Sequence, residues 1–204
     1  FLSYSYDPFR IEHCEIHSNQ LTGYILYLDG SRSATFNNNY AHHNSCNIAF
    51  YKYDQYGNFS LTQNIIEYNN AAERLIYVYY AYWYTYINIA DNIIRYNTGS
   101  DLIYIRYSYG EFKNNQIYAN SGSVKFETVE GCYNNFGSIA IENNTIVGNS
   151  GTGLDITSKY TIKNNIVAFN GGSELVYNSN HPGLQFNLFY DTNGTIGENP
   201  GGLL

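Results

Sequence analysis

The sequence is poor in charge, proline and cysteine, and it has no methionine. Only 13 % of its 204 residues are charged, with a formal net charge of −7. Because there is no basic run, we expect no nucleic-acid partner. No apolar run approaches the roughly 18 residues that a membrane-spanning helix needs, so we also expect no membrane span.

The three cysteines, Cys14, Cys46 and Cys132, are odd in number and far apart. This spacing predicts neither a zinc site nor a disulfide framework, and we expect no cofactor. Few charges with many tyrosines and asparagines favour an extracellular or cell-surface protein. Three triplets match the N-glycosylation pattern, and they begin at Asn58, Asn143 and Asn193. Since the chain begins with Phe1, we expect a processed product or a segment of a longer surface protein, folded as one domain over residues 1–204.

Asparagine is abundant and recurs in a repeat. The segment IENNTIVGN at 141–149 returns as IKNNIVAFN at 162–170, and six more segments fit the same frame. Each copy reads apolar-x-apolar-x-x-Asn-x-apolar-x-x-Asn. The copies end at Asn19, Asn44, Asn69, Asn97, Asn120, Asn149, Asn170 and, degenerately, Thr192.

Three columns run through the copies. Eight positions before the end, the residues are Ile11, Phe36, Leu61, Ile89, Phe112, Ile141, Ile162 and Leu184. Three positions before the end, they are Ile16, Ala41, Ile66, Ile94, Ile117, Ile146, Val167 and Phe189. Five positions before the end, Cys14 is followed by Asn39, Asn64, Asn92, Asn115, Asn144, Asn165 and Asn187.

These columns predict stacked strands. Apolar residues two apart lie on one face of a strand, and we expect the following Asn to turn the chain, because Asn tolerates left-handed conformations. Copies stacked at the strand spacing would let the amides bond along the stack as an asparagine ladder. A second inward strand is expected after each copy, as at Ile48/Phe50, Leu102/Tyr104, Val124/Phe126, Leu154/Ile156 and Leu175/Tyr177.

Over nearly the whole chain this pattern resembles the right-handed parallel β-helix repeat proteins of the pectin-lyase-like superfamily. The stretch NLFYDTNGTIGENPGGLL is similar to the last coil of secreted members. The expected fold is all-β, a right-handed single-stranded parallel β-helix (solenoid) of about eight coils with Asn ladders. Leucine-rich repeats are the rival fold, but they need leucine columns and helical returns, whereas DLIYIRYSY and SVKFETV are β-branched and aromatic.

The resemblance also implies an enzyme hypothesis, because many relatives are polysaccharide lyases or glycosidases. Such sites need paired carboxylates, or acidic residues that hold Ca²⁺ beside a basic residue. The chain has no Asp-Asp, Gly-His-Gly or Arg-x-Lys, and we expect Asp29 and Asp54, which share a column, to be solvent-facing turn residues. We therefore predict no catalytic residues, and a lyase or glycoside hydrolase remains the alternative.

A polar column lies two positions before the frame end. It contains His17, His42, Glu67 and Arg95, and His13 and His43 are nearby. Two imidazoles and a carboxylate about 5 Å apart have the chemistry of a transition-metal site. Solvated polar residues at an exposed turn are the other interpretation, so the sequence leaves a metal site of His17, His42 and Glu67 open.

The stretch YVYYAYWYTY at 77–86 crowds six tyrosines and a tryptophan together. If the strand holding Ile87 extends backwards, alternate rings face outward. Counting columns from the frame end then predicts an aromatic binding face of Tyr56, Tyr82, Tyr84, Tyr86, Tyr107 and Tyr109. Stacking that only stiffens the solenoid is the other interpretation.

Three functions follow from these features. The first is an extracellular, non-catalytic structural or binding β-helix that forms filaments or adheres through self-association, end to end or laterally. Open strand edges and enrichment of Tyr at interfaces favour it. The second is polysaccharide binding by the same aromatic face, and the third is the lyase or hydrolase.

Overall fold

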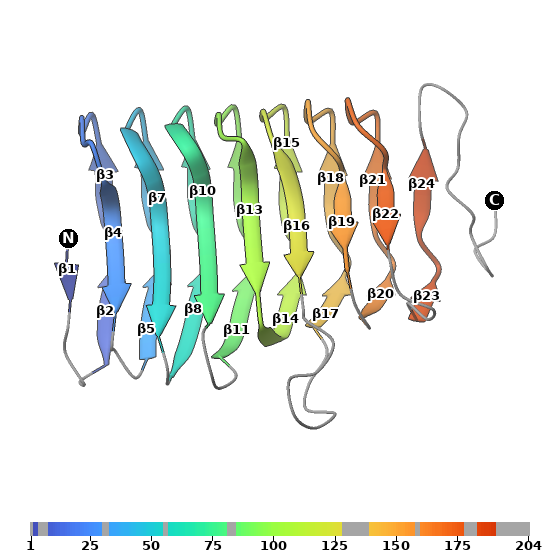
Figure 1. Cartoon of the computed structure of the whole chain (residues 1–204), viewed down its shortest axis with the longest axis horizontal. Helices are drawn as coiled ribbons and strands as arrows, with labels where there is room; N and C mark the ends of the chain where they lie inside the picture. The colour runs from blue at the N-terminus through green and yellow to red at the C-terminus, as the bar shows by residue number, and fades with distance from the viewer. Residues whose placement is uncertain are drawn as a thin grey trace.

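The computed structural model describes residues 2–3, 8–29, 33–54, 57–80, 85–127, 139–157, 160–177 and 183–190. They form a parallel β-solenoid in which every turn passes through three sheets (Figure 1). The predicted all-β parallel solenoid is confirmed. The leucine-rich rival is wrong, because the described returns at 101–106 and 123–127 form strands and not helices. Within the described ranges, no helix is long and apolar enough to span a membrane.

Each of the three sheets contains eight strands. Sheet A consists of β1 (Leu2–Ser3), β4 (Tyr24–Asp29), β7 (Ser45–Asp54), β10 (Asn70–Tyr80), β13 (Asp101–Arg106), β16 (Ser123–Glu127), β19 (Leu154–Ile156) and β22 (Leu175–Tyr177). Sheet B consists of β2 (Phe9–Glu12), β5 (Ser33–Asn37), β8 (Asn58–Thr62), β11 (Thr85–Ala90), β14 (Ser108–Lys113), β17 (Ile139–Glu142), β20 (Thr161–Lys163) and β23 (Gly183–Gln185). Sheet C consists of β3 (Glu15–His17), β6 (Tyr40–His42), β9 (Ile65–Glu67), β12 (Ile93–Arg95), β15 (Gln116–Tyr118), β18 (Thr145–Val147), β21 (Ile166–Ala168) and β24 (Leu188–Tyr190).

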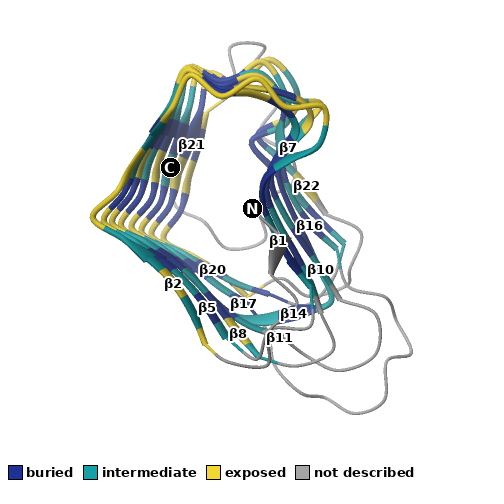
Figure 2. Cartoon of the chain, turned by 90° about the vertical axis from the view of Figure 1, so that its left-hand side faces the viewer, coloured by how far each residue is buried: buried dark blue, intermediate teal, exposed yellow. Residues whose placement is uncertain are grey.

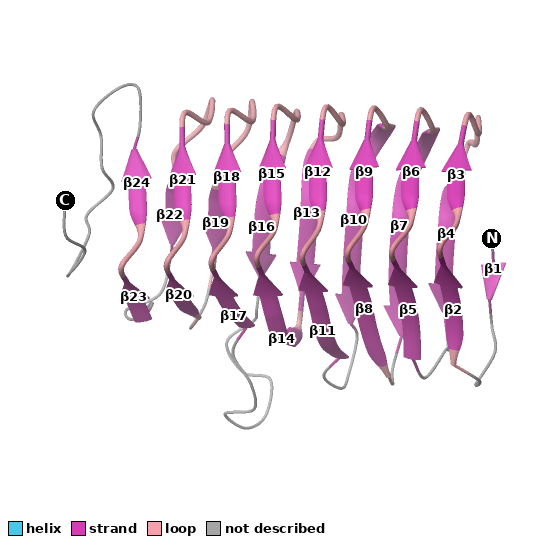
Figure 3. Cartoon of the chain, turned by 180° about the vertical axis from the view of Figure 1, so that it is seen from behind, coloured by secondary structure: helices cyan, strands magenta, loops and turns pink. Residues whose placement is uncertain are grey.

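The turns run from sheet A through sheet B to sheet C (Figure 3). The turns from β4 to β21 have a neighbouring turn on both sides, whereas the first and last coils pack on one described neighbour each. About six turns are therefore fully stacked, rather than the eight coils that were predicted.

The core lies between the three sheets, which surround it in the end-on view, with bands of buried residues along each sheet (Figure 2). The two predicted apolar columns are confirmed. One pairs in register along sheet B from Ile11 to Leu184, and the other along sheet C from Ile16 to Phe189. Burying each such side chain contributes roughly 1.5–3 kcal/mol, so the repeat supplies a continuous core.

Two asparagine ladders follow the corners on either side of sheet C. In the first, Asn92 donates to Asn115 Oδ1 from its backbone nitrogen (3.2 Å) and from Nδ2 (2.9 Å). The same contacts continue to Asn187. The closing asparagines form the second ladder, and Asn170 ends it by donating from its nitrogen and Nδ2 to Glu174 (2.9 and 2.5 Å). Glu174 thus replaces the amide that the degenerate last copy lacks.

The ladder asparagines do not themselves turn the chain, which corrects the expectation. The preceding residue takes the left-handed conformation, as at Asn38 (φ 54°) and Asn114 (φ 57°). Asn39 is only 3 % exposed and Asn115 is fully buried. The buried amide satisfies backbone groups of its neighbours, so it must point into the wall of the solenoid.

Sheet A departs from the predicted columns. Asp29 pairs with Tyr53, which lies 24 residues further along the chain, and not with Asp54. On sheet B, partners such as Ser33 and Asn58 are 25 residues apart. Tyr104 pairs with Tyr77 in the outer column, although it was predicted to point inward. The pairing of β13 with β16 also shifts its register between Asp101 and Ile103. The corner between sheets A and B varies in length, so counting across it fails.

Candidate functional site

The outer face of sheet A carries a continuous ladder of tyrosine rings. Tyr77 and Tyr79 alternate with the buried Ile76 and Val78, so their rings lie on the outside. Parallel, in-register strands place tyrosines opposite one another. The tyrosine ladder consists of Tyr24, Tyr27, Tyr51, Tyr53, Tyr77, Tyr79, Tyr104 and Tyr107.

Several of these rings stack face to face. The Tyr51 and Tyr77 centroids are 4.9 Å apart with an interplanar angle of 5°, and those of Tyr77 and Tyr104 are 5.3 Å apart at 13°. Tyr53 and Tyr79 stack at 5.6 Å and 12°. Because the faces cover one another, the ladder presents mainly ring edges to its surroundings.

Basic side chains lie over the C-terminal half of the ladder. The Arg74 guanidinium is 4.4 Å from the Tyr77 ring centroid and 5.0 Å from that of Tyr104. Arg106 lies 4.7 Å from the Tyr107 ring, and Lys125 Nζ lies 5.3 Å from the Tyr104 ring. Each contact is a cation–π interaction of about 0.5–2 kcal/mol.

Acidic partners complete this half of the ladder. Asp101 accepts from Arg74 Nε at 3.3 Å, and Glu127 is paired with Arg106 Nη2 at 3.3 Å. Tyr104 Oη donates a short hydrogen bond to Glu127 Oε2. Burial raises the pKa of Tyr104 above its usual value, and this hydrogen bond raises it further. Burial likewise raises the pKa of Tyr51, so both phenols are neutral at physiological pH.

The predicted aromatic face is only partly described. Tyr86 and Tyr109 share a column on sheet B as predicted, with an edge-to-face contact at 5.4 Å. Tyr107 instead contacts Tyr79 of the ladder. The other three predicted members, Tyr56, Tyr82 and Tyr84, lie outside the described residues. Prediction missed most of the ladder, although the Tyr-x-Tyr pairs at 51–53 and 77–79 signal it.

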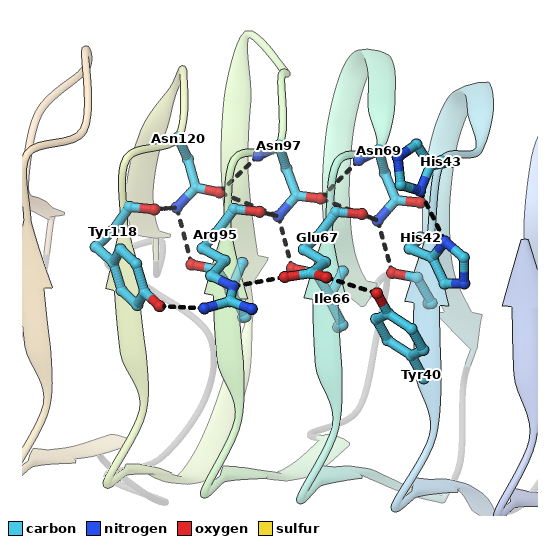
Figure 4. Close-up of polar contacts among 12 residues, drawn as sticks. Tyr40, His42, His43, Ile66, Glu67, Asn69, Arg95, Asn97, Tyr118 and Asn120 are labelled. Carbon is cyan, nitrogen blue, oxygen red and sulfur yellow. Dashed lines mark hydrogen bonds and ion pairs between the residues drawn. The ribbon is translucent and has the colours of Figure 1, made fainter.

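The second candidate site is polar and lies on the outer face of sheet C and the adjoining turn (Figure 4). We call it the polar cluster; it consists of Glu15, Tyr40, His42, His43, Glu67, Arg95 and Tyr118. Strands β6, β9, β12 and β15 place His42, Glu67, Arg95 and Tyr118 in one column. The stacking of this column was predicted correctly.

Glu67 is the centre of the cluster and is only 6 % exposed. Tyr40 Oη donates to its Oε1 at 2.6 Å, and Arg95 Nε donates to its Oε2 at 2.5 Å. Arg95 Nη1 also donates to Tyr118 Oη at 2.9 Å. Burial opposes ionisation of Glu67, but the hydrogen bonds from Tyr40 and Arg95 outweigh it and lower its pKa.

The imidazoles form the other half of the cluster. His42 Nε2 lies 2.8 Å from Glu15 Oε1, and its Nδ1 lies 2.7 Å from His43 Nδ1. The hydrogen bond from His42 lowers the pKa of Glu15. His17 stacks on His42 with ring centroids 5.2 Å apart and planes at 6°.

This geometry does not support the metal site suggested for His17, His42 and Glu67. The Glu67 oxygens are occupied by Tyr40 and Arg95, and the two imidazoles lie face to face. In the part of the chain that the structure describes, no group of three or more His, Cys, Asp and Glu side chains is arranged to hold a metal ion. Proton exchange among carboxylate, imidazole and phenol is the chemistry that the cluster offers.

The remaining predicted sites are the glycosylation asparagines and the cysteines. Asn58 and Asn143 are exposed, and Asn193 lies outside the described residues. Cys14 is exposed and Cys46 is buried, both as free thiols. Burial raises the pKa of the Cys46 thiol to about 11, so it is an unreactive core residue.

Comparisons with protein-family models, with curated proteins and with the solved structures gave no match for the chain.

Proposed function

We propose that the chain is an extracellular, non-catalytic structural solenoid of the pectin-lyase-like type that associates laterally with further copies of itself. The observation that carries this proposal is the tyrosine ladder, a partly exposed aromatic face across four neighbouring strands of sheet A. Tyr and Arg are among the residues that are enriched at protein–protein interfaces.

Contact with protein suits this face better than contact with sugar. Sugar rings stack on exposed aromatic faces, whereas the faces of Tyr51, Tyr77 and Tyr104 are covered by one another. Paired charges around the rings also suit a self-complementary interface, in which one patch meets the same patch of a second copy. Polysaccharide contact is the alternative occupant of the same face.

Sedimentation velocity over a wide concentration range, with electron microscopy, tests the proposal. The double variant Tyr53→Ser/Tyr79→Ser removes ring area from the ladder, and Tyr86→Ser/Tyr109→Ser is the matched control on sheet B. We expect the ladder variant to weaken association at least about tenfold, while the control associates normally. Circular dichroism verifies that both remain folded. A wild-type chain that stays monomeric throughout contradicts lateral association, and a glycan array then tests the polysaccharide alternative.

The polar cluster supports a second candidate, a polysaccharide lyase or glycoside hydrolase. His42 contacts both Glu15 and His43, so a proton carrier lies beside a carboxylate on an outer face. Screening against uronate-containing and neutral polysaccharides tests this candidate. Activity that disappears in His42→Ala but survives in His13→Ala would favour it, and a uniformly inactive wild type would remove it.

A further inference from the structure

The tyrosine ladder places eight oxidisable rings in one chain of contacts. Neighbouring centroids are 4.9 to 6.2 Å apart from Tyr24 to Tyr107. Rings in van der Waals contact exchange an electron readily, so an electron vacancy created on one ring is shared along the ladder. Which ring finally holds the radical depends on where its phenolic proton can go.

A phenol that loses an electron becomes strongly acidic, so its radical settles where a proton acceptor is in place. Tyr104 Oη already donates to Glu127. Tyr107 Oη instead accepts a hydrogen bond from Arg106 Nη2 at 3.0 Å. The hydrogen bond from Tyr27 Oη to Asp29 is 3.4 Å, which is long for a hydroxyl donor. Tyr104 is therefore the ladder phenol with a close carboxylate acceptor already in place.

The surroundings of Tyr104 favour an uncharged radical. Arg74 and Lys125 lie over its ring, at 5.0 and 5.3 Å, and they oppose a cationic ring. Transfer of the proton to Glu127 removes that charge. The Glu127 side chain is 22 % exposed, so the proton can pass on to water. Tyr104 itself is 8 % exposed, so a bulky oxidant meets other ladder rings first.

We propose that the tyrosine ladder is a site of one-electron oxidation in which Tyr104 holds the radical and Glu127 takes the proton. A one-electron oxidant at the surface, such as a high-valent metal complex, gains the electron. The Tyr104 O–H bond breaks, its proton forms an O–H bond with Glu127 Oε2, and a neutral phenoxyl radical remains. Tyr77, stacked on Tyr104, is the last relay.

Photo-oxidation with ruthenium tris(bipyridine) and persulfate, followed by freeze-quenching and high-field electron paramagnetic resonance, tests the proposal. The expected wild-type spectrum is dominated by one hydrogen-bonded neutral tyrosyl radical. Tyr104→Phe should abolish that signal, and Glu127→Gln should lower it several-fold. Glu142→Gln is the matched control, because Glu142 pairs with Lys113 on sheet B, away from the ladder.

The relay is tested separately. Tyr77→Phe keeps a stacked ring but removes the oxidisable phenol, and it should lower the Tyr104 signal several-fold, while Tyr109→Phe should not. A Tyr104→Phe spectrum identical to that of the wild type overturns the proposal, as does an undiminished signal in Glu127→Gln. These outcomes do not depend on self-association. The spectra can be recorded at a concentration where sedimentation shows monomers, and they can equally be recorded on the assembled form.

Discussion

Glu67 shows what one buried side chain contributes to this solenoid. Its carboxylate joins β6, β9 and β12 through Tyr40 and Arg95. A buried carboxylate is tolerated only when it is paired, and loss of one partner typically costs about 3–5 kcal/mol. Glu67 therefore holds the outer face of sheet C in register, whatever surface chemistry the cluster also performs.

The lowered pKa of Glu67 predicts how stability depends on pH. The ionised carboxylate contributes stability above the unfolded pKa, taken as 4.5, and loses it as the pH falls through the lower folded value. Between about pH 5 and about pH 3, the melting temperature of the wild type should fall more steeply than that of Glu67→Gln. Glu12→Gln is the control, since Glu12 lies 3.8 Å from an exposed Arg10. Parallel curves for wild type and Glu67→Gln would contradict the prediction.

Residue-level prediction succeeded where the repeat has a fixed length. Between Leu61 and Ile66, every spacing from strand to turn to strand is the same in each copy, so columns on sheets B and C could be read directly. The column of His42 and Glu67 was visible for the same reason. Its partners were not, because hydrogen bonding depends on how far a side chain such as Tyr40 reaches across strands.

At the scale of the element, the asparagine ladders are the devices that fix the corners. Asn115 accepts from Asn92 and donates from Nδ2 to the Ile89 carbonyl (2.9 Å) and to Asn144 Oδ1 (3.0 Å). One amide therefore joins its own coil to the coils before and after it. Among the described residues of sheet A no such ladder follows the strands, and this is where columns counted from the sequence were wrong, at Asp54 and Tyr104.

Removing one amide from an asparagine ladder should lower the free energy of unfolding more in the middle of the ladder than at its end. Asn115→Ala removes the acceptor of the Asn92 backbone N–H and the donor to the Ile89 carbonyl, whereas Asn92 Nδ2 keeps its bond to the Leu61 carbonyl. Each buried group that loses its partner costs about 1–3 kcal/mol. We expect urea denaturation to show a loss of about 3–5 kcal/mol. The matched control is Asn19→Ala. Asn19 is the exposed first member of the second ladder, and its replacement should lower the free energy of unfolding by about 1 kcal/mol. Equal losses would show that the ladder does not work as a cooperative element.

At the scale of the whole molecule, the two ends of the stack are built differently. At the first coil, the inward residues Phe9, Ile11 and Ile16 are only partly buried against the core. At the other end, Glu174 is 4 % exposed and closes the second ladder within the coil that contains Asn170. Because each coil contacts only its neighbours, stability is local and each end opens independently.

Glu174→Ala should therefore loosen one end and leave the other unchanged. Without the carboxylate, the backbone nitrogen of Asn170 loses its acceptor and Nδ2 keeps only the Ile146 carbonyl, at a cost of about 1–3 kcal/mol. Hydrogen–deuterium exchange should accelerate about tenfold or more in β18 and β21, while β5 and β6 exchange as in the wild type. Glu174→Gln keeps one acceptor oxygen and should fall between the two. Acceleration spread evenly over all coils would mean that the solenoid opens as one unit, and unchanged exchange at β21 would mean that Glu174 is not a cap.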